Sequence, residues 1–467
     1  MFKIILNIEN IGIIANADIK IEGVTVIAGS NSSGKSTVGR VLYAIGTSLA
    51  ESSYIKLFKQ KLNIIDNELN RLKKISLDEE SLAIAEEATA LLDNMSYIIS
   101  MLEEHPTSQK EFENQSINFS NKLKKIINSL EETVITQSLT TGNLEGEMEV
   151  DLDDILIRMS IKEIKKILDT DILKEDNLKF EMLQSVFNNE FNSQISNLTS
   201  NNLKSTISFT EVNNNSGKLV FIEDVLDREA STININREFV RPIFIDDPTV
   251  IDEISESIRI YLGGKKLSYN HKSYLIDLLK QTNSDENVFS KKKNDEMINA
   301  ILKEVIDGNI SINGRKSFYE IPYSDRNKKL SLSNLSTGMK SFSILSILKN
   351  SGAFNTVEYV ILDEPEIHLH PEWQLKYAEL IVLLSKYLNI KFLVTSHSPY
   401  FIEAIELFSM KHGIEGKVNY YKSKHTQNPN FYTIEDYTQR LSDIYDELAE
   451  SMFDLQNLRD ELELEEE

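Results

Sequence analysis

Residues 24–37 read VTVIAGSNSSGKST, and this stretch decides the fold. Its first four residues, 24–27, form a largely β-branched run that is typical of a buried parallel strand. Residues 29–36 then match the pattern G-x-x-x-x-G-K-[ST] in full, and apolar residues at helical spacing follow from Val38 to Ile45. Strand, glycine-containing loop and helix stand in the order that a phosphate-binding loop requires. A chance match in a Gly/Ser-rich turn is disfavoured by this context.

The residue types explain the chemistry of the loop. Gly29 and Gly34 let the backbone curl, so that successive N–H groups and the helix N-terminus face a polyphosphate. Lys35 can reach the β- and γ-phosphates, and the Ser36 hydroxyl can bind Mg²⁺. The predicted nucleotide-binding residues are Gly29, Ser30, Asn31, Ser32, Ser33, Gly34, Lys35, Ser36 and Thr37.

A second motif lies at residues 357–371, VEYVILDEPEIHLHP. A nearly continuous apolar strand that ends in two carboxylates is what a second central strand beside the loop should look like. Asp363 would hold Mg²⁺, and Glu364 would orient and polarise the attacking water. A buried strand that ends in a solvated acidic turn is the alternative, and the phosphate loop disfavours it.

Three histidines invite functional interpretations. His368 and His370 lack a cysteine or an obvious third ligand, so a loop that crosses toward a partner subunit is favoured over a zinc site. His397 follows a third β-rich run in KFLVTSHSPY, residues 391–400. This position is on the ligand side of a parallel sheet and favours a γ-phosphate sensor over a structural histidine.

With these pieces in order, the chain resembles the ATP-binding-cassette (ABC) heads of SMC-like and OLD-like ATPases. The resemblance makes LSTGM, residues 335–339, the counterpart of the family's LSGGQ signature. It implies ATP and Mg²⁺ as cofactors and a head-to-tail homodimer or higher oligomer. Ser336 and Gly338, at the start of a helix over 339–349, would then cap the ATP of a second subunit. Thr337 and Met339 depart from the signature, and the Q-loop residue is assigned only to Asp246 or Asp247.

The predicted fold is α/β: an ABC-type P-loop NTPase head with a mixed or parallel central sheet, a flanking antiparallel sheet and a large helical insertion. The flanking strands are expected near 3–8, 18–21, 207–212 and 218–222. The predicted domains are a head at 1–50 and 205–435, an insertion at 51–204 for partner or target recognition, a helical subdomain at 249–305 and an acidic C-terminal helix at 436–467.

The C-terminal helix carries a heptad of leucines. The residues Leu441, Leu448, Leu455 and Leu462 recur every seven positions. A second series at the same spacing contains Tyr445 and Met452, and the charged Arg459 interrupts it. A helix that zips against another subunit and a helix that packs on its own head are both compatible with this pattern.

Composition limits the function classes. The 467 residues include no cysteine, which excludes disulfides, thiolate catalysis and thiolate metal sites. We expect a cytoplasmic protein without a membrane contact, because neither a signal peptide nor an apolar run of spanning length is evident. A net charge of −23 argues against a surface that binds nucleic acid throughout. Basic clusters at 291–293 and 326–329 leave a local DNA contact open, although solvated faces are favoured.

Three functions are considered. We expect the residues after His397 to be too few for the nuclease domain of OLD proteins. On that expectation the chain resembles the stand-alone ATPases of anti-phage systems such as Septu and PARIS. That resemblance implies an ATPase that senses infection or controls a separately encoded effector, such as a nuclease. A RecF- or SMC-like DNA-repair ATPase is the alternative. A non-hydrolysing switch is disfavoured by Glu364.

Overall fold

The computed structural model describes residues 3–75, 77–104, 109–141, 152–169, 175–197, 204–211, 215–237, 239–256, 270–280, 293–313, 316–320, 328–428 and 430–465. The chain divides into two compact units. The head unit comprises Met1–Thr47 and Gln184–Glu467, and the helical unit comprises Ser48–Leu183. The sequence placed the end of the insertion at residue 204, whereas the helical unit ends at Leu183.

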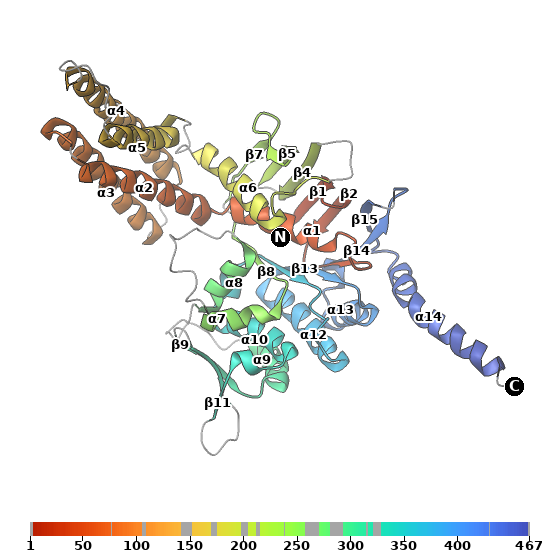
Figure 1. Ribbon diagram of the computed structural model, residues 1–467. Helices are drawn as coiled ribbons and strands as arrows, with labels where there is room; N and C mark the ends of the chain where they lie inside the picture. Colours follow the sequence, from red (N-terminus) through yellow and green to blue (C-terminus); the bar gives the residue numbers. More distant parts are fainter. Residues whose placement is uncertain are drawn as a thin grey trace. The chain divides into compact units, whose positions relative to one another are not determined.

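One continuous sheet forms the centre of the head unit (Figure 1). Within the described residues it runs in the order β6-β5-β4-β1-β2-β15-β14-β3-β13-β12-β8, with β7 paired to β5. Its strands are β1 (Ile4–Ile11), β2 (Ile14–Ile21), β3 (Val24–Ala28), β4 (Lys204–Glu211), β5 (Ser216–Ile222), β6 (Val225–Leu226), β7 (Thr232–Asn234), β8 (Ile243–Ile245), β12 (Tyr359–Asp363), β13 (Lys391–Ser396), β14 (Val418–His425) and β15 (Tyr432–Asp436). A small separate sheet contains β9 (Asn309–Asn313), β10 (Lys316–Glu320) and β11 (Lys329–Ser331).

The predicted fold class is confirmed. Strands β14, β3, β13, β12 and β8 are parallel, while β5, β4, β1 and β2 form antiparallel pairs. The antiparallel strands extend the same sheet, because β15 pairs antiparallel with β14 and parallel with β2. The carboxyl ends of β3, β13 and β12 therefore meet at one edge.

Helices cover both faces of the parallel strands. The alternate residues Val24 and Val26 belong to the core that α10, α12 and α13 share. On the other face α1 packs so closely that a Cβ on Gly39 would lie 2.8 Å from Ile361. The helices of the head are α1 (Lys35–Ser48), α6 (Glu175–Phe191, which begins in the helical unit), η1 (Pro248–Asp252), α7 (Glu253–Glu256), α8 (His271–Lys280), α9 (Lys293–Val305), η3 (Leu332–Asn334), α10 (Thr337–Asn350), α11 (Ala353–Thr356), α12 (Pro371–Leu388), α13 (Pro399–His412), η4 (Glu415–Lys417) and α14 (Ser442–Glu465).

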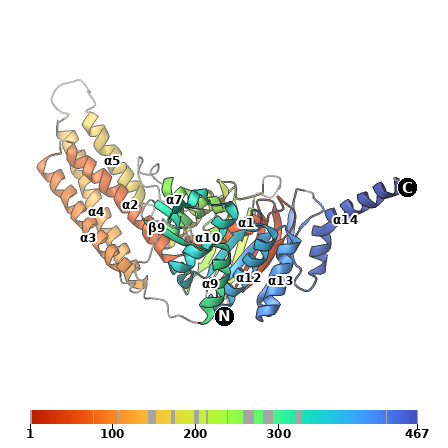
Figure 2. The same ribbon diagram turned by 90° about the horizontal axis from the view of Figure 1, so that it is seen from below.

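The helical unit is a bundle of long helices that lie side by side (Figures 1 and 2). Its members are α2 (Glu51–Lys74), α3 (Glu79–Glu104), α4 (Gln109–Thr141) and α5 (Leu152–Asp169). Each buries one apolar stripe, as the helical spacing predicts, including Leu62, Ile99, Ile127 and Ile164.

In the described part of the chain, no helix combines the length and apolar character needed to cross a membrane.

The leucine heptad divides between two environments. The helix α14 begins at Ser442, a few residues after the predicted start. Leu441 and Leu448 pack against the head core, and the Tyr445 hydroxyl donates a hydrogen bond to Glu406 (2.7 Å). Leu455 and Leu462 are exposed. The first half of the repeat therefore packs on its own head, and the second half does not.

Some predictions fall on residues that the structure does not describe. These include Val212, the segments 257–269 and 281–292 of the predicted helical subdomain, and Lys291, Lys292 and Arg326 of the basic clusters. In the second basic cluster, Lys329 forms an ion pair with Glu320 (2.8 Å).

Candidate nucleotide-binding site

The loop between β3 and α1 is shaped by its glycines and held by neighbouring strands. Gly34 has a φ of +88°, and a Cβ there would lie 2.9 Å from the Ile14 side chain. Gly29 has a φ of +154°. The Ser423 hydroxyl of β14 donates a hydrogen bond to the Ser33 carbonyl (2.6 Å). The loop therefore needs glycine at positive φ and is fixed in place by the sheet.

Lys35 turns its ammonium group back into the loop. Nζ donates hydrogen bonds to the carbonyls of Gly29 (3.0 Å) and Ser30 (2.7 Å). It also lies 3.1 Å from Oε1 of Glu364. The residue is only 3% exposed, so these contacts offset the cost of burying its charge. Phosphate oxygens would compete with Glu364 for the same ammonium group.

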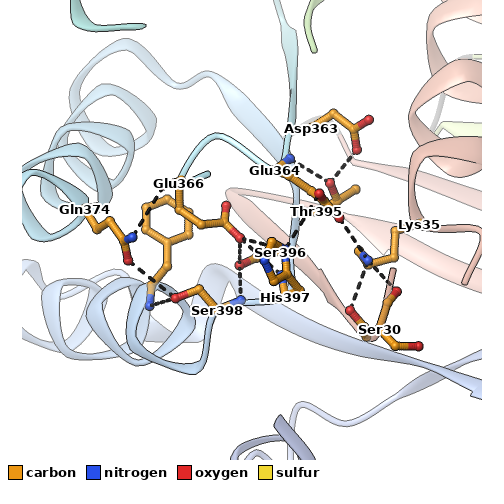
Figure 3. Close-up of polar contacts among 12 residues, drawn as sticks. Ser30, Lys35, Asp363, Glu364, Glu366, Gln374, Thr395, Ser396, His397 and Ser398 are labelled. Atoms are coloured by element: carbon orange, nitrogen blue, oxygen red, sulfur yellow. Dashed lines mark hydrogen bonds and ion pairs between the residues drawn. The ribbon is translucent and has the colours of Figure 1, made fainter. Parts of the chain in front are cut away.

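Ser36 and Asp363 meet at the edge of the sheet. The Ser36 hydroxyl donates to Oδ1 of Asp363 (2.9 Å), and the Thr395 hydroxyl donates to the same oxygen (2.5 Å; Figure 3). Burial raises the pKa of Asp363 above its usual range, and the charges of Glu364 and Asp246 act in the same direction. A hydroxyl and a carboxylate are oxygen donors of the type that Mg²⁺ prefers, so this pair fits that cation.

Glu364 occupies a strained backbone position between the loop and His397. Its φ is +48°, a left-handed conformation that is uncommon for residues other than glycine. The backbone N–H is held by both the carbonyl (3.1 Å) and the hydroxyl (3.0 Å) of Thr395. Its carboxylate reaches Lys35 on one side and lies 3.7 Å from Nδ1 of His397 on the other.

A buried carboxylate lies behind His397. Glu366 is 2% exposed and accepts hydrogen bonds from the Ser396 hydroxyl (2.6 Å) and the His397 backbone N–H (3.1 Å; Figure 3). Its Oε1 lies 3.7 Å from Nδ1 of His397. Burial raises the pKa of Glu366. The Ser398 hydroxyl donates a hydrogen bond to Oε1 of Gln374 (3.4 Å), which extends the network to α12.

The signature segment lies at the start of α10, next to Trp373 of α12. Ser336 is exposed and caps α10, where its hydroxyl accepts a hydrogen bond from the Met339 N–H (3.3 Å). Gly338 is buried, and a Cβ there would lie 3.0 Å from the Trp373 ring and 3.2 Å from the His368 carbonyl. Among the described residues, no hydrogen bond joins Ser336 to the phosphate loop.

His370 has a local role in the structure. It is the N-cap of α12, and its Nδ1 accepts a hydrogen bond from the Glu372 N–H (3.4 Å). His368 is exposed. The described residues contain no group of three or more His, Asp or Glu side chains placed to hold a metal ion. A cation at Ser36 and Asp363 would therefore take further ligands from phosphate and water.

The structure distinguishes the two Q-loop candidates. Asp247 caps η1 by accepting hydrogen bonds from the N–H (2.8 Å) and the hydroxyl (2.7 Å) of Thr249. Asp246 instead pairs with Nε2 of His271 (3.0 Å), and it follows a strand that is parallel to the one ending in Asp363. Asp246 is therefore the candidate that lies next to Asp363 by strand register, and its role stays a prediction.

Sequence reasoning missed three residues at the site. Thr395 links Asp363 to Glu364, Glu366 supports the His397 backbone, and His271 contacts Asp246. The spacing Glu-Pro-Glu at 364–366 was a usable signal for Glu366, since the two carboxylates flank a proline. No local pattern marks His271, because its partners are far away in the sequence.

A model of the AAA ATPase domain family matches residues 3–402. A curated relative described as "Retron Ec83 probable ATPase" from Escherichia coli is 28% identical over 163 residues, which are 32% of this chain and 29% of that protein. Septu protein PtuA from Bacillus thuringiensis is 30% identical over 114 residues, or 21% of this chain and 28% of that protein. The chain thus spans under a third of the length of these two relatives.

Solved structures also resemble the chain. An SMC head domain from Thermotoga maritima is 12% identical with a TM-score of 0.36, covering 93% of this chain and 97% of that one. An Smc head bound to the C-winged helix domain of ScpA is 10% identical with a TM-score of 0.39, covering 92% and 96%. The sheet order and the family match establish the fold class.

We expect the free energy of unfolding to fall as the pH rises from 6.5 to about 9. Burial opposes the charge of His271, but Asp246 and Glu190 outweigh it and raise its pKa from 6.5 to about 9. The folded chain therefore holds a proton that the unfolded chain has released across this window, and that stabilisation is lost as pH rises. Urea denaturation should show a loss on the order of 3 kcal/mol that is absent in His271→Gln. Equal slopes for both proteins would contradict this assignment.

Proposed function

Because this chain belongs to the AAA ATPase domain family, we propose that it hydrolyses ATP with Mg²⁺ at the site formed by β3, α1, β12 and β13. The observation that carries this proposal is the 3.1 Å contact of Lys35 with Glu364. It places the cation of a phosphate-binding loop beside the carboxylate that a hydrolytic reaction needs. We infer that the activity is cytoplasmic.

Each residue of the site has a defined task in this proposal. The loop N–H groups and Lys35 bind the β- and γ-phosphates, while Ser36 and Asp363 hold Mg²⁺, which neutralises phosphate charge when bound. Glu364 orients a water and accepts its proton as the water oxygen bonds to the γ-phosphorus. The bond from that phosphorus to the β–γ bridging oxygen breaks, which yields ADP and phosphate. His397, supported by Glu366, contacts the γ-phosphate.

The complete site requires a second copy of the chain. Ser336 is exposed at the N-terminus of α10, where the partial positive charge of the helix favours an anion. This exposed terminus is therefore available to the ATP of a partner subunit. We propose a head-to-tail dimer or higher oligomer in which each ATP contacts both chains.

The biological role that we propose is control of a separately encoded effector, such as a nuclease, in anti-phage defence. The two curated relatives support this role, since one is named as a retron ATPase and the other as a Septu protein. The helical unit and the exposed half of α14 are candidate contact surfaces for that effector.

Substitutions at Lys35 and Glu364 should separate nucleotide binding from hydrolysis. Lys35→Ala should weaken ATP binding by about tenfold or more, because it removes the cation that faces the phosphates. Glu364→Gln should bind ATP normally and lose roughly 10²-fold or more in turnover, because the amide cannot accept a proton. Binding of a fluorescent ATP analogue and steady-state phosphate release measure the two effects. Wild-type turnover in Glu364→Gln would contradict the assignment.

Mixing two inactive variants should restore hydrolysis if the site is composite. Ser336→Arg blocks one half of the site and Lys35→Ala the other, so each should be inactive alone. A mixed dimer contains one site with both lesions and one intact site, and an equal mixture should recover about a quarter of wild-type phosphate release. Ser442→Arg, at an exposed serine on α14, is the matched control and should stay active. No recovery on mixing, or full turnover by Ser336→Arg alone, would refute the head-to-tail arrangement.

Native mass spectrometry should reveal the effector. The protein is expressed from its own operon, wild type beside Glu364→Gln, and purified without crosslinking. We expect a second polypeptide whose retention differs between the two proteins, because hydrolysis would control its release. A complex that contains only this chain would count against the effector role and would favour a DNA-directed ATPase, with salt-dependent binding to duplex ends as the next measurement.

A further inference from the structure

A buried histidine outside the predicted motifs lies between two carboxylates. His271 is the first residue of α8 and is 7% exposed. Its Nδ1 is 2.7 Å from Oε2 of Glu190, and its Nε2 is 3.0 Å from Oδ2 of Asp246. The His271 backbone N–H also donates to Oε1 of Glu190 (3.1 Å). Glu190 therefore holds both the ring and the start of the helix.

Aromatic packing fixes the ring in this position. The imidazole stacks on Phe244 with a centroid separation of 4.5 Å and meets the edge of Tyr43 at 5.8 Å. These contacts leave the ring little freedom to turn away from either carboxylate. Each of the two acidic residues also has a basic neighbour. Nζ of Lys272 lies 3.5 Å from Oδ2 of Asp246, and the Arg40 guanidinium donates a hydrogen bond to the backbone carbonyl of Glu190 (3.4 Å).

Asp246 connects this cluster to the proposed metal site. It directly follows β8, which pairs in parallel with β12 so that Ile245 lies opposite Leu362. The next residues along these strands, Asp246 and Asp363, therefore emerge side by side at the same edge. Their proximity has an electrostatic effect, since the charge of Asp246 adds to burial in raising the pKa of Asp363.

Residues 246–252 are linked to two helices that lie far away in the sequence. Glu190 lies on α6, the helix that begins in the helical unit and ends in the head unit. At the other end of this segment, Asp252 accepts a charged hydrogen bond from Nζ of the buried Lys340 of α10 (2.8 Å). The helix that leads back from the insertion is thus linked to Asp246 through His271, and the helix with the signature serine contacts Asp252 directly.

We propose that His271 is a positioning residue: anchored by Glu190 of α6, it fixes Asp246 beside Asp363, where Asp246 accepts a hydrogen bond from a water bound to Mg²⁺. This proposal rests on the proposed function in that Ser36 and Asp363 hold the cation. It adds a physical link through which a shift of α6 changes metal binding. Outer-shell partners of this kind commonly alter metal affinity without touching the metal.

The test is the Mg²⁺ dependence of nucleotide binding by the full-length protein. A fluorescent ATP analogue is titrated into wild type, His271→Gln, Asp246→Asn and the double variant, at a series of Mg²⁺ concentrations and in EDTA. His271→Gln should require about tenfold more Mg²⁺ and bind the analogue in EDTA as wild type does. Asp246→Asn should cause a similar shift, and the double variant should add little to it.

A matched control separates positioning from general destabilisation. His412 is similarly buried, and its Nε2 lies 2.9 Å from Glu379 on the α12–α13 surface. His412→Gln should leave the Mg²⁺ dependence unchanged. If His271→Gln does not fold, Glu190→Gln, which keeps the side-chain shape, and Asp246→Asn carry the test.

The outcomes are distinct. A His271→Gln protein with the same Mg²⁺ dependence as His412→Gln, or shifts that add fully in the double variant, would overturn the positioning role. Wild-type protein that shows no Mg²⁺-dependent nucleotide binding would instead overturn the proposed function.

Discussion

The hydrogen bond between Ser36 and Asp363, 2.9 Å long, is the contact on which the rest of the site depends. It joins the first turn of α1 to the end of β12, although the two residues are 327 positions apart. It forms because β3 and β12 both pair in parallel with β13, which brings their carboxyl ends to one edge of the sheet. The same pairing of strands brings Glu364 next to Lys35. The sheet topology alone therefore places the charges needed for phosphate chemistry beside one another.

Buried charge is the second recurring feature of the head unit. Lys35, Glu366 and His271 are each almost fully buried, and each contacts groups of opposite charge or hydrogen-bonding partners. Burial of an ionised group is costly unless such partners are present, and pairs of this kind contribute little net stability compared with apolar packing. The presence of Lys35 and Glu366 at one edge of the sheet is therefore better explained by the chemistry of that edge than by stability.

Much of the site could be predicted from sequence because its main parts are local motifs. The loop at 29–36 is flanked by its own strand and helix signals. Asp363 ends a recognisable strand, and Glu364 and His397 each directly follow one. The roles of Thr395 and His271 could not be predicted, because they depend on neighbours that only the sheet order brings together. The leucine heptad left two interpretations open for a related reason. A repeat shows which residues are apolar, but which of those leucines are buried depends on the surface of the head against which the helix packs.

The most direct measurement of the central claim is an anomalous scattering map of the protein crystallised with Mn²⁺ and a non-hydrolysable ATP analogue. We predict a metal peak within coordination distance of the Ser36 hydroxyl and a phosphate oxygen, next to Asp363, with the direct Ser36–Asp363 hydrogen bond replaced by the metal. A nucleotide bound away from residues 29–37, or a bound nucleotide that leaves the Ser36–Asp363 hydrogen bond intact with the metal elsewhere, would contradict the account.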